Sequence, residues 1–308
     1  MQVTVVIPTY NRSEILSETL ERLAQQDFVK GGYEVIVVDD GSRDGTQAVL
    51  ESFAKKNLFP LRFFLQHNQG QGIARNHAVQ EAHGKIIVFI GDDILPHRDF
   101  LKEHMQFHHQ YMRENEAVLG LTLWDSRIPK TPFTEFMTSG GIFFGRFGGH
   151  QFAYDRLKGK KMADYNFFYT SNLSMKRSLL LKYPFDDSFH SYGWEDIELG
   201  YRLTKEVDLK LYYNPDAIAD HYHPMDPESL FGRLKAIGKS AHIIHKKYPE
   251  LQKVPPFWKK VILGFLTNSF FLHFSKFFMH RFPRTRWHFL YYYLISKKAF
   301  LEGIEEGI

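Results

Sequence analysis

The chain has 308 residues, a formal net charge of +4 and no cysteine. This length allows a large buried core and favours two subdomains over one. The lack of cysteine excludes disulfides, thiolate zinc sites and cysteine nucleophiles. The first residues, Met1-Gln2-Val3-Thr4, lead directly into a predicted strand, so we expect no signal peptide. The longest apolar stretch, 261–274, is too short to span a bilayer.

Apolar runs typical of buried strands alternate with helical patterns along the first ninety residues. The runs are 3–7, 33–38 and 86–90, and residues 61–65 give a shorter strand. The intervening helices are expected to begin with a cap at Ser13, at Asp44 or Thr46, and after Gly70-Gln71-Gly72. This alternation predicts an α/β fold with a doubly wound, mostly parallel sheet.

Polar residues follow three of these strands directly. Tyr10 and Asn11 follow the first strand, Asp39 and Asp40 the second, and Asp92 and Asp93 the strand 86–90. Open α/β sheets bind ligands outside the carboxyl ends of their strands, and adjacent carboxylates there suit Mg²⁺ or Mn²⁺. The alternative is that these residues only form turns, since Asp and Gly are common turn residues.

The phosphate-binding loops of two large nucleotide-binding classes are missing from the sequence. No Gly-x-Gly-x-x-Gly turn follows the first strand, and no Gly-x-x-x-x-Gly-Lys-Ser/Thr segment occurs anywhere. Dinucleotide-dependent oxidoreductases and P-loop ATPases therefore lose their main support. The type of site that remains possible is one in which carboxylates and a cation hold the nucleotide.

Four motifs in order resemble the family 2 glycosyltransferases of GT-A fold. They are VVIPTYNR (5–12), VVDDGSRDGT (37–46), GIARN (72–76) and FIGDD (89–93). The resemblance covers roughly residues 1–225. It implies a Rossmann-like nucleotide-binding half, an acceptor-binding half, and transfer of a sugar from a nucleotide diphosphate donor with inversion.

The same resemblance implies roles for individual residues. Tyr10 and Asp40 would hold the base of a UDP-sugar, and Arg75 would approach its diphosphate. Asp92 and Asp93 would bind ribose and a divalent cation, Mn²⁺ or Mg²⁺, with Asp93 as the main metal ligand. Many relatives have Asp-x-Asp here, whereas this chain has Gly91 at the first position. The full donor-binding set is Pro8, Tyr10, Asp40, Arg75, Asp92 and Asp93.

Two further segments carry candidate functional groups. Glu195 and Asp196 open a helix, where the helix dipole favours acids in any case. Alternatively, one of them takes the proton from an acceptor hydroxyl. The resemblance implies that Asp196 is this base and that Glu195 supports it. The rings of His221 and His223 share one face of an extended segment, and the resemblance implies that His221, with His223 as the reserve, completes the metal site.

We expect three regions. The resemblance implies a nucleotide-sugar-binding half (1–96) and an acceptor-binding half (97–225), and the composition indicates a helical tail (226–308). The second contains a histidine-rich helix at 97–113, which we interpret as solvated or at an interface, and a flexible loop at 124–164 rich in Gly, Phe and Arg. Such a loop suits an acceptor-side lid.

The tail is basic and aromatic. No acidic residue occurs between Glu250 and Glu302, an interval that contains nine Lys or Arg residues. This composition is typical of helices at an anionic membrane interface, and the alternative is a homodimer interface. No nucleic-acid recognition module accompanies the charge. We therefore expect a protein on the cytoplasmic face of the plasma membrane, bound peripherally.

The sequence thus predicts a metal-assisted glycosyltransferase that builds a cell-surface polysaccharide or glycolipid. Its partners would be a nucleotide-sugar donor and a glycan or lipid-linked acceptor. Two alternatives remain open at this point. One is a catalytically silent sugar-nucleotide-binding or scaffolding protein, and the other is a sugar-phosphate nucleotidyltransferase.

Overall fold

The computed structural model describes residues 2–29, 31–139, 153–190, 192–282 and 285–307. The chain forms two compact units. The first comprises Met1–Asp125, Leu157–His190 and Glu195–His223, and the second comprises Ser126–Arg156, Ser191–Trp194 and Pro224–Ile308. The predicted tail therefore lies in the second unit, together with most of the predicted loop 124–164.

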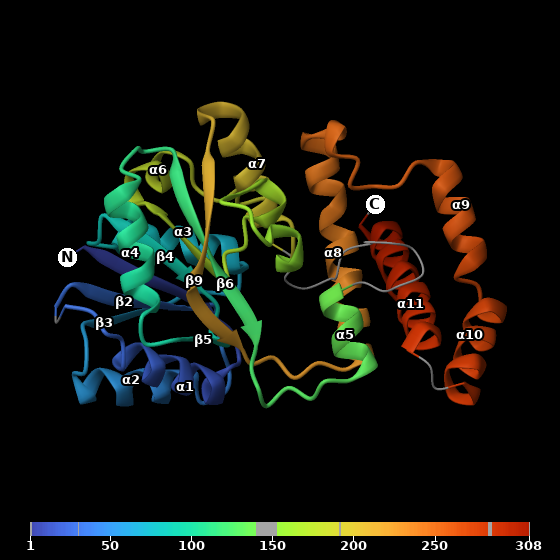
Figure 1. Ribbon diagram of the computed structural model, residues 1–308, viewed down its shortest axis with the longest axis horizontal. Coiled ribbons are helices and arrows are strands. Elements are labelled where there is room, and N and C mark those ends of the chain that lie inside the picture. Colours follow the sequence, from blue (N-terminus) through green and yellow to red (C-terminus); the bar gives the residue numbers. More distant parts are fainter. Residues whose placement is uncertain (1, 30, 140–152, 191, 283–284, 308) are drawn as a thin grey trace. The chain divides into compact units, whose positions relative to one another are not determined.

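A mixed sheet with helices on both faces forms the first unit (Figure 1). Among the described residues its order is β3-β2-β1-β4-β8-β6-β9-β5, and β7 pairs with β9. The neighbours β3, β2, β1 and β4 are parallel, as the sequence predicted, whereas β8 runs antiparallel to β4 and β6. The strands are β1 (Val3–Thr9), β2 (Tyr33–Asp39), β3 (Leu61–Leu65), β4 (Ile86–Ile90), β5 (Ile94–Pro96), β6 (Glu116–Trp124), β7 (Met162–Ala163), β8 (Asn172–Lys176) and β9 (Lys210–His221).

The helices of the first unit begin close to their predicted positions. Ser13 does not cap α1 with its side chain but is the first helical residue, and its backbone N–H donates to Asp44 Oδ2 at 3.0 Å. Asp44 Oδ1 accepts from the Thr46 backbone N–H at 3.0 Å, so one carboxylate holds the first turns of two helices. The helices are α1 (Ser13–Ala24), α2 (Thr46–Lys56), α3 (Gln71–Glu81), α4 (Phe100–Gln110), α6 (Arg177–Lys182) and α7 (Glu195–Val207).

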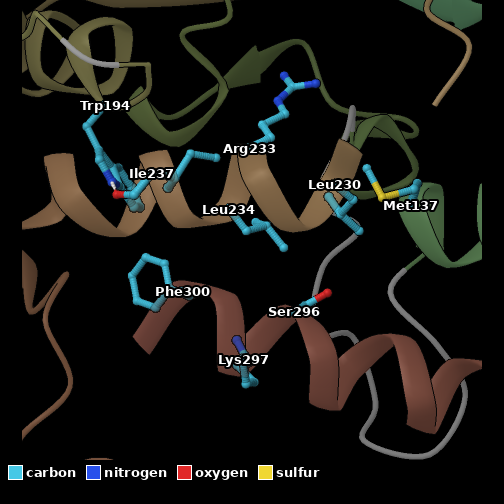
Figure 2. A pocket seen from close by; sticks show the side chains of 9 residues that line it. All are labelled: Met137, Trp194, Leu230, Arg233, Leu234, Ile237, Ser296, Lys297 and Phe300. Carbon is cyan, nitrogen blue, oxygen red and sulfur yellow. Dashed lines mark hydrogen bonds between the residues drawn. The ribbon is translucent and has the colours of Figure 1, made fainter. Parts of the chain in front are cut away.

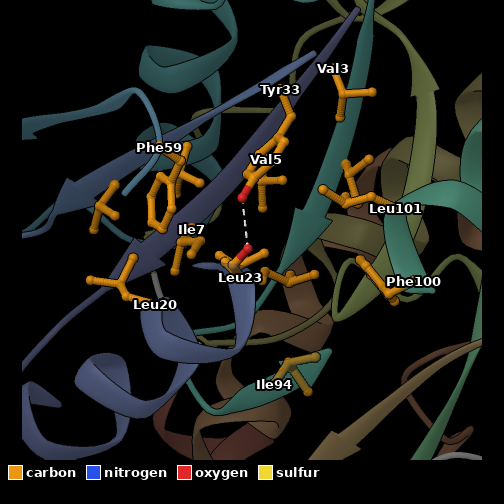
Figure 3. Close-up of a cluster of buried hydrophobic side chains, with 14 of the residues drawn as sticks. Val3, Val5, Ile7, Leu20, Leu23, Tyr33, Phe59, Ile94, Phe100 and Leu101 are labelled. Carbon is orange, nitrogen blue, oxygen red and sulfur yellow. Dashed lines mark hydrogen bonds between the residues drawn. The ribbon is translucent and has the colours of Figure 1, made fainter. Parts of the chain in front are cut away.

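Alternate residues of the central strands build two separate cores. Val3, Val5 and Ile7 of β1 pack into a cluster with apolar side chains of α1, α2 and α4 (Figure 3). The Tyr33 hydroxyl closes this cluster by donating to the Leu23 carbonyl oxygen at 2.7 Å. On the opposite face, Phe89 packs edge-on against Phe185, with ring centroids 5.5 Å apart. β1, β2 and β4 are thus buried on both faces, as the sequence predicted, whereas β3 at the edge of the sheet is only partly covered.

Two histidines of α4 face the core, so the predicted solvated or interface helix is wrong for them. His104 lies 2.8 Å from Ser174 Oγ and 2.9 Å from Asn172 Oδ1, and His108 lies 2.8 Å from the same Ser174 hydroxyl. Burial lowers the pKa of His104 to about 4 and that of His108 to about 3. Both rings are therefore neutral parts of a buried polar network.

The second unit is helical. Part of the predicted loop 124–164 forms a helix, and residues 140–152 lie outside the described residues. Helices α8 and α11 approach each other through Gly238 and Gly303, because a Cβ on either would overlap the other helix's backbone. The helices are α5 (Pro132–Ser139), α8 (Pro227–Lys247), α9 (Phe257–Leu266), α10 (Ser269–Arg281) and α11 (Thr285–Glu306).

A cavity of about 180 Å³ lies within this second unit (Figure 2). Its lining is mainly apolar and includes Leu234, Ile237 and Phe300, with Arg233 and Lys297 as the charged members. None of the residues that line it belongs to the predicted catalytic or donor-binding set.

In the part of the chain that the structure describes, no single helix has the length and hydropathy needed to cross a membrane. Helices α9 and α10 meet that requirement only when taken together, and they are bent relative to each other by 50°.

Candidate active site

The ends of β1, β2 and β4 are joined by hydrogen bonds through Thr9. Its carbonyl oxygen accepts from the Asp40 backbone N–H at 2.9 Å, and its hydroxyl donates to Asp92 Oδ2 at 2.7 Å. The parallel register, with Thr9 beside Asp39, brings these carboxyl ends to one edge of the sheet. The predicted donor residues at the three strand ends therefore lie together.

Both oxygens of the buried Asp40 carboxylate accept hydrogen bonds from the protein. Oδ1 accepts from Gln66 Nε2 at 2.8 Å and from the Gln69 backbone N–H at 2.9 Å, and Oδ2 accepts from the Gly70 backbone N–H at 2.9 Å. Gly70 has a φ of +97°, which favours glycine, and it leads directly into α3. Asp40 thus holds the loop 66–70, which leads into the N-terminus of α3.

Asp39 is buried too, but its two oxygens differ in their hydrogen bonding. Its Oδ1 accepts from the Ser42 backbone N–H at 2.8 Å, while Oδ2 has no hydrogen-bond partner among the described residues. Pro8 is buried in β1 opposite Val38, whereas the Tyr10 ring is 47% exposed. The sequence favoured Asp40 over Asp39 for ligand contact, and only the hydrogen-bond partners distinguish the two.

Asp93, His221 and His223 converge as a group of three possible metal ligands. Asp93 Oδ2 lies 3.3 Å from His221 Nε2 and 3.0 Å from His223 Nδ1, and the two rings stack with centroids 5.4 Å apart. One ligand atom from each residue lies within 4.8 Å of the others. The short strand β5 causes this convergence because Ile94 pairs antiparallel with His221.

The surrounding charges shift the pKa values of the neighbouring residues Asp92 and Asp93 in opposite directions. Burial alone would raise the pKa of Asp93, but His221 and His223 hold it well below its usual range. Burial and the charge of Asp93 raise the pKa of Asp92 to about 7. Arg12 adds a positive charge: its Nη2 lies 2.7 Å from His223 Nδ1 and 3.5 Å from Asp93 Oδ2. Sequence reasoning did not predict this arginine contact.

A second charged cluster joins α3 to the start of α7. Arg75 Nη1 lies 3.2 Å from Glu195 Oε1, and its Nη2 donates to Gln71 Oε1 at 3.0 Å. Both Arg75 and Glu195 are almost fully buried, and Arg75 Nε and Glu195 Oε2 have no hydrogen-bond partner among the described residues. Arg75, predicted to approach the diphosphate, is thus ion-paired with a predicted active-site acid.

Asp196 lies next to this ion pair in the first turn of α7. Burial and the charge of Glu195 raise the pKa of Asp196 to about 7, against the opposing effect of Arg75. Its Oδ1 accepts from the Ile197 backbone N–H at 2.8 Å. A carboxylate with a pKa near 7 is suited to accept a proton at neutral pH.

Comparison with known proteins identifies the family. The family described as "Glycosyl transferase family 2" matches residues 4–133. The uncharacterized glycosyltransferase YfnE of Bacillus subtilis (strain 168) is 31% identical over 271 residues, which covers 75% of this chain and 67% of YfnE. A Methanococcus voltae dolichyl N-acetyl-alpha-D-glucosaminyl phosphate 3-beta-D-2,3-diacetamido-2,3-dideoxy-beta-D-glucuronosyltransferase is 26% identical over 225 residues, which covers 71% of this chain and 66% of that enzyme. This chain therefore spans about two thirds of each relative's length.

Solved structures show the same fold. The mannosyltransferase PcManGT from Pyrobaculum calidifontis, in complex with GDP-Man and Mn²⁺, matches with a TM-score of 0.63 at 20% identity, over 96% of this chain and 86% of that one. S. aureus TarS 1-349 in complex with UDP matches with a TM-score of 0.53 at 19% identity, over 99% and 91% of the two chains. The fold is GT-A, as the sequence predicted, and the chain belongs to glycosyl transferase family 2 as a glycosyltransferase enzyme.

Proposed function

We propose that the enzyme moves a sugar from a UDP-sugar to an acceptor hydroxyl with inversion, with Asp196 as the general base. The observation that carries this proposal is the raised pKa of Asp196, about 7, beside the buried pair Arg75–Glu195. Asp196 takes the acceptor proton while the acceptor oxygen bonds to the anomeric carbon. The bond from that carbon to the phosphate oxygen breaks, and the nucleoside diphosphate leaves with the electron pair. One base and no covalent sugar intermediate are needed.

The donor would lie at the joined strand ends. The exposed ring of Tyr10 is free to stack on a base, and Asp39 Oδ2 is a buried acceptor without a partner among the described residues. We assign the contact to the base's N–H group to Asp39, because Asp40 already accepts three hydrogen bonds within the protein. TarS with bound UDP is one structure of this fold, which supports the choice of UDP.

The residues present fit a divalent cation. One carboxylate and two imidazoles, from Asp93, His221 and His223, form a ligand set suited to Mn²⁺, and PcManGT was solved with Mn²⁺. A cation held there would stabilise the negative charge that develops on the leaving diphosphate. Arg12, which contacts both His223 and Asp93, lies where it can bind phosphate oxygens.

We propose a glycan or lipid-linked acceptor and a place on the cytoplasmic face of the membrane. The Methanococcus voltae relative is named for an acceptor that carries a dolichyl phosphate, which supports this class. The basic composition of 251–301 supports the location. A cell-surface polysaccharide or glycolipid is the product that this combination favours.

The variant Asp196→Asn tests the proposal. It should abolish sugar transfer while the affinity for the UDP-sugar, measured by calorimetry with Mn²⁺ present, stays within about twofold. The matched control is Glu206→Gln, an exposed acid on the same helix, which should retain full activity. Full transfer by Asp196→Asn would refute its role as the base. Release of pyrophosphate instead of UDP by the unmodified enzyme would refute glycosyl transfer.

A further inference from the structure

Helices α9 and α10 expose a continuous series of large apolar side chains. None of the ten residues of α9 is buried, and in α10 only Ser275 is. Ten large apolar side chains of this region are between 37 and 82% exposed: Phe257, Trp258, Val261, Ile262, Phe265, Leu266, Phe270, Phe274, Phe277 and Phe282. We call these residues the α9–α10 apolar surface. Soluble proteins rarely leave such a surface in water, so it indicates an interaction site.

This surface belongs to folded helices. The Asn268 side chain caps α10 by accepting from the Phe271 backbone N–H at 3.1 Å. Phe278 of α10 packs against Trp287 of α11, with ring centroids 4.8 Å apart. The α9–α10 apolar surface is therefore part of the folded second unit, and its side chains are exposed although the helices are folded.

The charges on the same helices are all positive. Lys259 and Lys260 lie on α9, and Lys276 and Arg281 lie on α10, while no acidic residue occurs between Glu250 and Glu302. Apolar and aromatic side chains mixed with Lys and Arg are typical of helices at the boundary between headgroups and acyl chains. A surface of anionic phospholipid matches both features.

We propose that the α9–α10 apolar surface binds an anionic lipid bilayer and that the two helices lie in the plane of its interface. At about 1.5 Å per residue the helices are roughly 15 and 20 Å long, shorter than the roughly 30 Å of hydrocarbon. Their 50° bend also breaks any straight span. Aromatic side chains enter the acyl boundary while the lysines contact lipid phosphates.

Charge disfavours a second copy of the chain as the occupant of this surface. In a two-fold symmetric dimer each patch meets its own copy, so Lys259, Lys260 and Lys276 would face other lysines. The stretch supplies no acid to pair with them. A bilayer with anionic headgroups offers the opposite charge over the whole surface.

Flotation of the full chain with lipid vesicles tests the apolar contribution without any sugar donor. Vesicles of phosphatidylcholine with 30% phosphatidylglycerol should bind the protein, and the variant Phe257→Ser/Phe265→Ser/Phe277→Ser should lose at least tenfold in partition coefficient. The control variant Val29→Ser/Leu58→Ser/Met112→Ser changes three side chains of the first unit that are more than half exposed. It should bind like the unmodified chain. Unchanged melting temperatures would show that both variants fold.

The charge contribution has its own matched pair of variants. Lys259→Gln/Lys260→Gln/Lys276→Gln should weaken binding by about fivefold per lysine. The control Lys55→Gln/Lys85→Gln/Lys160→Gln removes the same charge from exposed positions of the first unit and should have little effect. Pure phosphatidylcholine vesicles and 1 M salt should both reduce binding of the unmodified protein.

Three results would overturn the proposal. Vesicle binding that is the same in the apolar variant and its control would exclude this surface. Vesicle-bound protein that resists extraction by alkaline carbonate would mean that the helices cross the bilayer. A dimer that the apolar variant converts to a monomer, with no vesicle binding by either form, would identify a second copy as the occupant. Because no assay here uses a donor or acceptor, these results are independent of sugar transfer.

Discussion

Arg75 and Glu195 form a buried ion pair, with Nη1 3.2 Å from Oε1, directly beside Asp196. The two members act on Asp196 in opposite directions. The charge of Glu195 adds to burial in raising the pKa of Asp196, and Arg75 lowers it. The pair therefore sets the pH at which the proposed base becomes active.

Substitution of either member should shift the pH dependence of kcat/KM. A general base works only when deprotonated, so activity should rise with pH through about 7. Glu195→Gln removes a negative charge, which lowers the pKa of Asp196 and should move this rise to lower pH by about one unit. Arg75→Met should move it to higher pH by a similar amount. Full pH–rate profiles of both variants measure the two shifts.

These profiles need a check on folding, because removing one partner of a buried pair can cost about 3–5 kcal/mol. Melting temperatures should be measured first and the assays run well below them. Glu206→Gln serves as the control and should keep the profile unchanged. Shifts of both variants in the same direction would contradict the electrostatic role of the pair.

The ligand group of Asp93, His221 and His223 predicts Mn²⁺ binding without substrate. Asp93→Asn, His221→Ala and His223→Ala should each weaken Mn²⁺ binding by at least about tenfold, since each removes one ligand atom. The electron paramagnetic resonance signal of free Mn²⁺ measures this affinity. His109→Ala removes an exposed histidine and should leave it unchanged. Equal affinity in all four variants would place the cation elsewhere.

Substitutions of the neighbours Asp39 and Asp40 should have different effects, on ligand binding for Asp39 and on loop structure for Asp40. Asp39→Asn replaces the carboxylate whose Oδ2 has no partner among the described residues, and it should weaken UDP binding about tenfold with little change in melting temperature. Asp40→Asn cannot accept all three internal hydrogen bonds and should lower stability by roughly 1–3 kcal/mol. Calorimetry with UDP and thermal unfolding measure the two effects. The reverse pattern would restore Asp40 as the base-contacting residue.

Local patterns were sufficient to predict β1 to β4 and the carboxylates that follow them. Each buried run is continuous in sequence, and parallel register brings such ends together without further information. The shared face of His221 and His223 followed from strand periodicity in the same way. These parts of the site depend only on residues that are close in sequence.

Contacts between distant segments could not be predicted. Arg75 and Glu195 are 120 positions apart, and Arg12 and His223 are 211 apart. The inward face of α4 depends on which strand it covers, so the sequence did not show that His104 and His108 are buried. The break between α9 and α10 was visible only as three polar residues, Thr267, Asn268 and Ser269, and their cap at Asn268 needed coordinates.

The crossing of α8 and α11 predicts opposite effects for two glycine substitutions. Gly303→Ala would place a methyl group against the Lys235 carbonyl oxygen and should destabilise the second unit by about 1–3 kcal/mol. Gly232→Ala, also helical, meets open space and should stabilise α8 by about 0.5–1 kcal/mol. Thermal unfolding compares the two variants. Destabilisation of equal size in both would contradict the close approach at Gly303.

The buried histidines of α4 should make stability fall in mildly acidic solution. His104 has a folded pKa of about 4 and an unfolded value near 6.5, so between these pH values the unfolded chain binds the extra proton. The contribution of His104 to the free energy of unfolding is therefore constant above about pH 6.5 and falls by roughly 3 kcal/mol as the pH drops toward 4. His108, with a pKa of about 3, adds to the same decline. Asp92 and Asp196, with pKa values raised to about 7, contribute in the opposite direction over this range, so the His104 contribution is measured as the difference between a variant and the unmodified chain.

The slope of the free energy of unfolding against pH distinguishes the titration of His104 from a loss of packing, which has the same effect at every pH. His104→Gln disturbs the hydrogen bonds to Ser174 and Asn172 at every pH. It should also remove the His104 contribution to the change in stability between pH 6.5 and 4, because the amide of glutamine does not titrate. His109→Gln replaces an exposed neighbour on the same helix and should keep the original slope. Urea unfolding at several pH values measures both slopes. The predicted difference arises only because the His104 ring stays neutral when folded and gains a proton on unfolding. If the free energy of unfolding of His104→Gln ran parallel to that of the unmodified chain at all pH values, His104 would not titrate in this range.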